Sequence, residues 1–88
     1  MTHALKTWPK YYQEITSGDK TFELRKFDRP FKVGDTLLLQ EFEPRTDGYG
    51  YTGNEIKKVI THILYNADEL GLMKDYAILS FKDIEPNY

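Results

Sequence analysis

Three charged residues lie close together in the chain at a spacing that suits ligand binding: Lys20, Glu23 and Arg25. Polar and apolar residues alternate through residues 20–27, and this alternation predicts a β-strand. Successive side chains of a strand point to opposite faces, so Glu23 and Arg25 share one face. A guanidinium can bond a phosphate or a base edge through two donors, and a carboxylate can accept from an exocyclic amine. With the Lys20 ammonium beside them, these groups suit a planar polar ligand such as a nucleobase with its phosphate.

The same alternation predicts which face of the strand packs. Phe22 and Leu24 are expected to face the core, whereas Thr21, Glu23 and Arg25 are expected to face solvent or a ligand. Charged residues are also common on the outer face of a strand without any function, and a solvated cluster contributes little stability. The alternation alone leaves two interpretations open, a ligand site or an ordinary solvated surface.

Written from Gly18, the segment reads G-x-K-x-x-E-x-R, which resembles the signature of the ASCH family, a branch of the PUA-like β-barrels. The resemblance is close over residues 3–43 and looser from residue 44. It rests further on the V-G-D turn within residues 31–37 and on upstream residues at matching spacing: Leu5, Lys6, Pro9, Tyr12 and Ile15. The chain is most similar to a small single-domain subgroup from bacteria and phages, of uncharacterised function. Members of this subgroup open with His, Leu and Lys, here His3, Leu5 and Lys6, and carry Tyr-Thr-Gly, here at 51–53.

This resemblance implies a small α+β fold that is mostly β, with a PUA-like barrel of about five strands, one main helix after the first strand and a short second helix. It also implies a cleft beside the first helix into which Lys20, Glu23 and Arg25 point. We therefore expect an RNA- or nucleotide-binding domain that reads an exposed base and its phosphate. Lys6 is a further candidate ligand contact.

A rival expectation is a small hydrolase that acts on a modified nucleoside or on RNA. One branch of the superfamily hydrolyses an acetylated cytidine nucleoside with a lysine, a threonine three residues later as the nucleophile, and a distant glutamate. Here Glu23 stands in the place of that threonine, and Thr21 points differently because it is adjacent to Lys20. The difference favours binding over catalysis; in an enzyme, Lys20 and Glu23 would be the catalytic pair. A third alternative is a phage or bacterial regulator that binds a protein partner.

The loop at residues 44–53 is the second source of candidate ligand contacts. Residues 48–53 formally match G-x-G-x-x-G, but a strand-like run follows them instead of the helix that a dinucleotide site requires. One interpretation is a mobile hairpin connection. The other is that Tyr49 or Tyr51 stacks on a base, with the loop as a lid over the charged strand.

The elements that must position these residues follow from periodicity and turn residues. Pro9 and Gly18 bound a helix over residues 9–17, with Thr7 as its cap. Three of its residues form a packing stripe, which we interpret as core and not as a ligand platform: Tyr11, Tyr12 and Ile15. The other predicted elements are strands at 3–7, 36–43, 55–65 and 76–81, and a short turn or helix at 66–70. Apolar residues on both faces of 36–43 predict a closed barrel with the helix outside.

Composition limits the class of protein. A chain of 88 residues is short enough that we expect a single domain, 1–88, with a loosely ordered tail at 83–88. The sequence contains no cysteine, so we expect neither disulfides nor thiolate metal sites. His3 and His62 are too far apart in the sequence to indicate a metal pair, and neither a metal nor a cofactor is expected. The longest apolar run, at residues 37–39, is too short to span a membrane, and the N-terminus lacks a signal pattern. A cytoplasmic protein without a membrane partner is the expectation.

The charge distribution bears on nucleic-acid binding. A net charge of −2 argues against binding by bulk electrostatics. Residues 1–32 hold seven Lys or Arg against four Asp or Glu, and residues 33–88 hold five against ten. The charged strand lies in the basic half, so a local positive cleft would favour selective and salt-sensitive binding.

Overall fold

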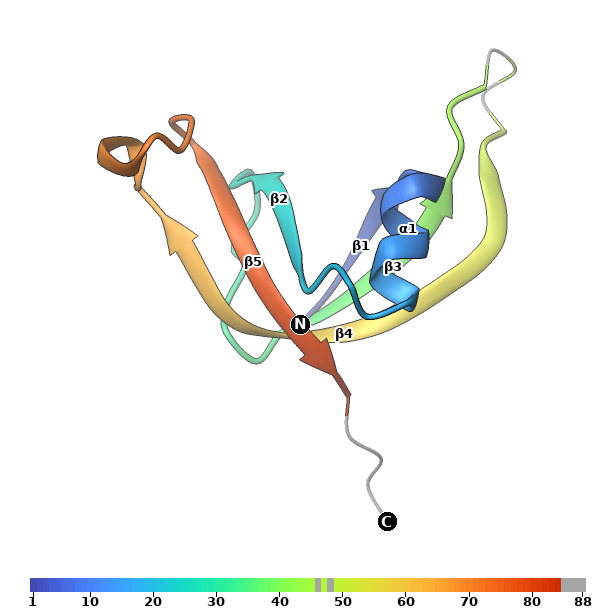
Figure 1. The fold of residues 1–88 in the computed structure, drawn as a ribbon, viewed down its shortest axis with the longest axis horizontal. Helices are drawn as coiled ribbons and strands as arrows, with labels where there is room; N and C mark the ends of the chain where they lie inside the picture. The colour runs from blue at the N-terminus through green and yellow to red at the C-terminus, as the bar shows by residue number, and fades with distance from the viewer. Residues whose placement is uncertain (46, 48, 85–88) are drawn as a thin grey trace.

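In the part of the chain that the structure describes, five strands form one curled sheet, and a single α-helix lies inside the curl (Figure 1). The computed structural model describes residues 1–45, 47 and 49–84. The elements are β1 (Thr2–Thr7), α1 (Pro9–Thr16), β2 (Phe22–Lys26), β3 (Thr36–Phe42), β4 (Tyr51–Tyr65) and β5 (Tyr76–Asp83). The strand order is β1-β3-β4-β5-β2; β1 runs parallel to β3, and the other neighbours are antiparallel. The fold is mostly β, as predicted, and each predicted strand is present.

The helix begins at Pro9 and ends just before Gly18, as the sequence predicts, but its N-terminal cap differs. Gly18 adopts a φ of 88°, a left-handed conformation that costs glycine little, and the chain turns there toward β2. The predicted cap is wrong. Thr7 is the last residue of β1 and is buried, and the N-cap position belongs to Trp8, which makes no capping hydrogen bond with its side chain.

The core lies on the concave face of the sheet, against α1. Its buried members are Leu5, Ile15, Phe31, Leu37, Leu39, Ile60, Ala77, Leu79 and Phe81. Ile15 brings the helix onto this face, where it packs over β3. The predicted closed barrel with an outer helix is therefore corrected. The described residues form an open half-barrel in which β1 and β2 are unpaired edge strands, because α1 supplies the apolar cover inside the curl.

The faces of β2 are reversed relative to the prediction. Glu23, which was expected at the surface, is 5% exposed, whereas Phe22 and Leu24, which were expected in the core, are 42% and 52% exposed. The strand pairs with β5 in a register that sets Glu23 opposite Leu79, on the core side of the sheet. Burial of the carboxylate is tolerated because two cations neutralise it, as described below.

Two smaller predictions concern the C-terminal half. The short turn or helix predicted at 66–70 is a single turn of 3-10 helix at Asp68–Leu70, and it ends at Gly71 with a φ of 94°. In the predicted loose tail, Asp83 is the last residue of β5, and residues 85–88 lie outside the described part of the chain. Within the described residues, the helices are too short and too polar to cross a membrane.

Candidate ligand-binding groove

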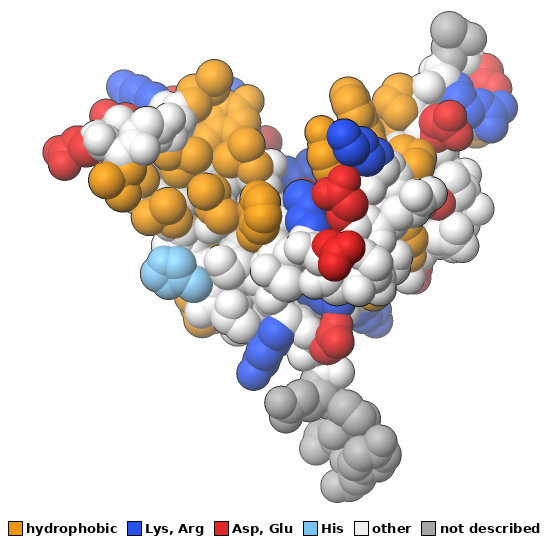
Figure 2. Space-filling model, viewed as in Figure 1, with side chains coloured by type: hydrophobic (Ala, Val, Ile, Leu, Met, Phe, Trp, Pro, Cys, Tyr) orange, Lys and Arg blue, Asp and Glu red, His pale blue; other side chains and the backbone are white. Residues whose placement is uncertain are grey.

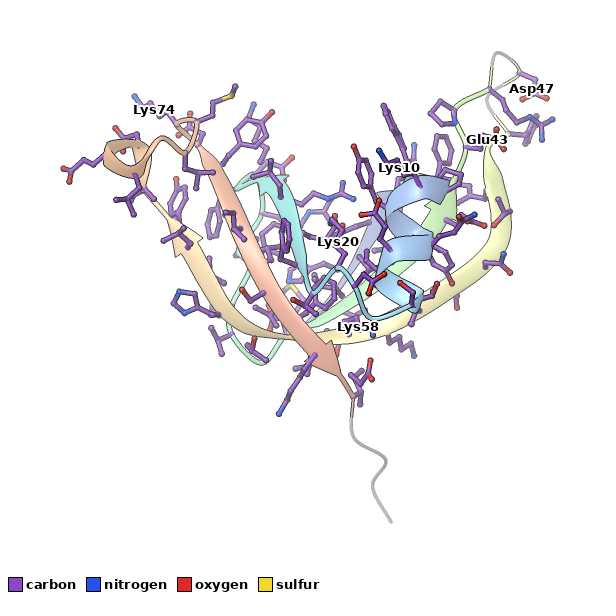
Figure 3. The ribbon with its side chains drawn as sticks, in the orientation of Figure 1. Lys10, Lys20, Glu43, Asp47, Lys58 and Lys74 are labelled. Atoms are coloured by element: carbon purple, nitrogen blue, oxygen red, sulfur yellow. The ribbon has the colours of Figure 1, made fainter. Side chains whose placement is uncertain are left out.

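A groove of about 610 Å³ lies between β2 and α1, beside the end of β1. Figure 2 shows the molecule hollowed between the two arms of the curled sheet, and Figure 3 places Lys20 between β2 and α1. Four segments line the groove: Lys6 and Thr7 in β1; Trp8, Tyr11 and Glu14 at the helix; Asp19 and Lys20 in the turn; and Phe22, Glu23, Leu24 and Arg25 in β2. The volume is in the usual range for sites that hold small molecules.

The three charged residues singled out in the sequence meet on the floor of this groove, and we call Lys20, Glu23 and Arg25 the charged floor. Glu23 lies at its centre: Oε1 accepts from Lys20 Nζ at 3.1 Å, and Oε2 accepts from Arg25 Nε at 2.9 Å. Lys20 also donates to the carbonyl of Phe22 at 2.6 Å. Because cations occupy both carboxylate oxygens, Glu23 orients Lys20 and Arg25, and these two retain further N–H groups for a ligand.

Arg25 also joins the two edges of the open sheet. Its Nη2 donates to the carbonyl of Lys6 in β1, and Arg29 Nη1 donates to the carbonyl of Ala4 at 3.4 Å. These side chains supply donors that a neighbouring strand would otherwise supply to the edge of β1. The groove is thus the space that remains where β1 and β2 do not pair.

Two exposed aromatic rings form the helix side of the groove. Trp8 and Tyr11 are 57% and 41% exposed, and their ring centroids lie 6.5 Å apart at an interplanar angle of 21°. The Lys20 ammonium lies 5.6 Å from the centroid of Tyr11, so the aromatic wall adjoins the charged floor. The interpretation of Tyr11 as core is wrong, since only Ile15 of the predicted stripe is fully buried. Sequence reasoning missed Trp8, although an aromatic residue just before Pro9, outside the apolar stripe, was a usable signal.

A residue with a hydroxyl group also lines the groove, and it is not the one considered from the sequence. Thr21 is exposed and does not line the groove. Thr7 does line it, with 2% of its surface exposed, and among the described residues its Oγ1 has no hydrogen-bond partner. Sequence reasoning missed this role of Thr7; alternation along β1, which puts Thr7 on the buried face with Leu5, was a usable signal, but its place beside the groove required the tertiary structure.

The other predicted contacts lie away from the charged floor. Lys6 lines the groove, but its ammonium lies 4.6 Å from the ring centroid of Phe42 and 5.8 Å from that of Tyr51. Neither Tyr49 nor Tyr51 lines the groove. In Figure 1, α1 lies between the loop that precedes β4 and strand β2. The described residues of that loop therefore do not form a lid over the charged strand.

The groove is not a positive cleft. Its lining carries three basic residues, Lys6, Lys20 and Arg25, and three acidic residues, Glu14, Asp19 and Glu23. Charge alone would therefore not draw a polyanion into it, although the charged floor by itself, with two cations and one anion, has one net positive charge. The lining suits a ligand that combines one anionic group with an aromatic or apolar group.

The buried His3 is accounted for by a structural contact. Its ring nitrogen lies 2.8 Å from Asp35 Oδ2, and the N-terminal amine lies 3.2 Å from Oδ1 of the same carboxylate. These bonds, the one from His3 foremost, hold the pKa of Asp35 below its usual value. Across residues 1–45, 47 and 49–84, no three His, Cys, Asp or Glu side chains gather as metal ligands would.

On the opposite flank of α1, the pKa of Tyr12 is raised, first by burial and then by the nearby charges of Glu41 and Glu55. Glu41 is itself buried, and its Oε1 accepts from Thr52 Oγ1 at 2.8 Å and from Asn54 Nδ2 at 3.1 Å. Tyr12 does not line the groove.

Comparison with known proteins places these residues in a family. Residues 2–81, which include the entire groove lining, match the sequence model of a protein family described as a domain of unknown function, DUF3850. The chain is also 34% identical, over 77 residues and 88% of its length, to an uncharacterized 12.9 kDa protein from the GpA 3' region of Escherichia phage P2. It covers 64% of the length of that phage protein. The resemblance to the ASCH family stays a prediction, whereas the match over residues 2–81 shows that this chain belongs to the DUF3850 family.

Proposed function

We propose that this domain binds a single-stranded nucleic acid or a nucleotide by holding one unpaired base and its phosphate in the groove between β2 and α1. The observation that carries the proposal is the meeting of an exposed aromatic pair, Trp8 and Tyr11, with the charged floor in one groove. Single-stranded nucleic acids are commonly bound through such a combination of stacking and phosphate contact.

Each part of the groove has a role in this proposal. The indole of Trp8 offers a flat exposed surface on which a base stacks, and each such stack is worth about 1 to 3 kcal/mol. Lys20 and Arg25 bind the phosphate, since both retain unused donors. Glu23 accepts a hydrogen bond from each of the two cations and thereby orients both in the groove. The balanced charge of the lining favours a short unpaired segment over a duplex, whose binding depends on many phosphate contacts.

Trp8 provides the assay because it is the only tryptophan in the chain. Titration with a single-stranded RNA hexamer should quench its fluorescence as a base stacks on the ring. We expect Trp8→Ala, followed with a fluorescein-labelled hexamer, to weaken binding by about 5- to 100-fold, because it removes one stack. Arg25→Ala and Lys20→Gln should each weaken binding and make it less dependent on salt. The slope of the logarithm of the binding constant against the logarithm of the salt concentration should become shallower by about 0.7 for each phosphate that the variant no longer neutralises.

Matched variants outside the groove serve as controls. Lys74→Gln removes a positive charge from an exposed residue that Figure 3 shows far from Lys20, and Tyr49→Ala removes an exposed aromatic ring that does not line the groove. Neither should change the affinity by more than about twofold, as expected for surface substitutions that make no contact. Equal binding by wild type, Trp8→Ala and Arg25→Ala, or no binding by any of them, would refute the proposal.

The hydrolase alternative is tested with the same samples. Incubation with N4-acetylcytidine and with a short RNA, followed by chromatography, detects turnover directly. Turnover that is lost in Lys20→Gln would establish an enzyme and would replace the binding proposal. A partner protein captured equally well by wild type and Arg25→Ala would instead favour the role of a protein-binding regulator.

A further inference from the structure

We propose that the hydroxyl of Thr7 is the specificity contact of the groove, and that it exchanges a hydrogen bond with the polar edge of the bound base. This inference rests on the proposed function and adds to it a residue that distinguishes one base from another. The groove places Thr7 beside the charged floor, at the last position of β1 and directly before Trp8.

The Thr7 hydroxyl is the exception to a strong rule about buried polar groups. Nearly all buried side-chain polar atoms have a hydrogen-bond partner, and an unpartnered one destabilises the fold. In the described part of the chain, Thr7 Oγ1 is buried without a partner. A valine would fill the same volume and suit a strand equally well, without the unsatisfied hydroxyl. Folding therefore gives no reason for a hydroxyl at this position, and the adjoining groove gives one.

The Thr7 hydroxyl is closed off from solvent in the free protein, and Arg25 is bonded to the chain next to it. The guanidinium of Arg25 donates to the carbonyl of Lys6, the residue before Thr7, and its side chain is 27% exposed. A ligand phosphate competes with that carbonyl for the guanidinium, because a phosphate carries a full negative charge and can accept two parallel hydrogen bonds from arginine. In this proposal, a shift of Arg25 from the Lys6 carbonyl to the phosphate opens the end of β1, where the edge of the base meets Thr7 Oγ1.

The substitution Thr7→Val tests the hydrogen bond between Thr7 and the base, because it keeps the shape of the side chain and removes the hydroxyl. We would titrate wild type and variant with hexamers of uridylate, cytidylate and adenylate, and with an abasic ribose-phosphate hexamer of equal charge. We expect the wild type to prefer one of the three bases. Thr7→Val should bind that hexamer about 3- to 10-fold more weakly, as for the loss of one neutral hydrogen bond, and should bind the abasic hexamer as the wild type does.

Two further measurements exclude a purely structural role for Thr7. Thr7→Val should melt at the same temperature as wild type or higher, since it removes an unsatisfied buried hydroxyl, and Thr7→Ser should keep the base preference. A lowered melting temperature for Thr7→Val, or an unchanged base preference, would overturn the role of Thr7 and leave the proposed function standing. If the wild type bound no hexamer, the proposed function would fail, and the role of Thr7 with it.

Discussion

Replacement of Glu23 by glutamine tests whether the charged floor is a real structural unit. Glutamine keeps the size of the side chain but removes the charge that Lys20 and Arg25 share at 3.1 and 2.9 Å. Hydrogen bonds to charged groups contribute about 1.5 to 3 kcal/mol each when they are shielded from water. The side chains of Lys20 and Arg25 are 14% and 27% exposed, so solvent compensates part of the loss. We therefore expect Glu23→Gln to lower the free energy of unfolding by about 1 to 3 kcal/mol in total.

Thermal unfolding followed by circular dichroism measures this loss. In a domain of this size, 1 kcal/mol corresponds to about 4 to 8 °C, so the melting temperature should fall by about 5 to 20 °C. Asp28→Asn is the matched control, since it breaks an exposed ion pair with Arg29 at 3.8 Å and should cost less than about 0.5 kcal/mol.

The double variant Lys20→Met/Glu23→Gln sharpens the test. Loss of the carboxylate alone leaves Lys20 and Arg25 to repel each other, and removal of Lys20 along with it relieves that repulsion. If the three charges act together, the double variant should therefore be more stable than the summed losses of Lys20→Met and Glu23→Gln predict. A melting temperature for Glu23→Gln equal to that of Asp28→Asn, or strictly additive losses in the double variant, would show that the charged floor does not exist as described.

Three further predictions concern the rest of the fold. The bond from His3 lowers the pKa of Asp35 in the folded state, so its stabilising contribution is present above the unfolded pKa of about 4 and is lost as the pH falls through the folded value. The urea midpoint of wild type should therefore decrease more steeply below about pH 4 than that of Asp35→Asn, and parallel curves would contradict this assignment. Gly50→Ala should destabilise the β3–β4 hairpin by about 1 to 3 kcal/mol, because a Cβ there would collide with the Glu43 carbonyl oxygen and lie 2.8 Å from the Phe42 ring. Unchanged thermal stability of this variant would rule out that close approach. Leu39→Ala removes a completely buried side chain at the centre of the core and should cost about 2 to 5 kcal/mol in urea unfolding, whereas Leu70→Ala, at an 81% exposed position, should cost almost nothing.

The sequence by itself determined the features that depend on neighbours along the chain. Alternation located the strands, since the period of two residues is a property of the extended backbone. Pro9 and Gly18 bounded the helix because their backbone preferences are intrinsic. The contact between Lys20, Glu23 and Arg25 was also predictable, because residues this close in sequence have little freedom to separate once the strand forms.

Tertiary structure alone decided which of these residues lie inside the molecule and which line the groove. Alternation divides β2 into two faces, and it predicted that the face with Phe22 and Leu24 meets the core. Pairing of Glu23 with Leu79 in β5, together with neutralisation by two cations, turned the carboxylate inward instead. The position of α1 inside the curl left the rings of Trp8 and Tyr11 exposed and brought Thr7 beside them. These outcomes depend on contacts between segments distant in sequence, and no local pattern encodes such contacts.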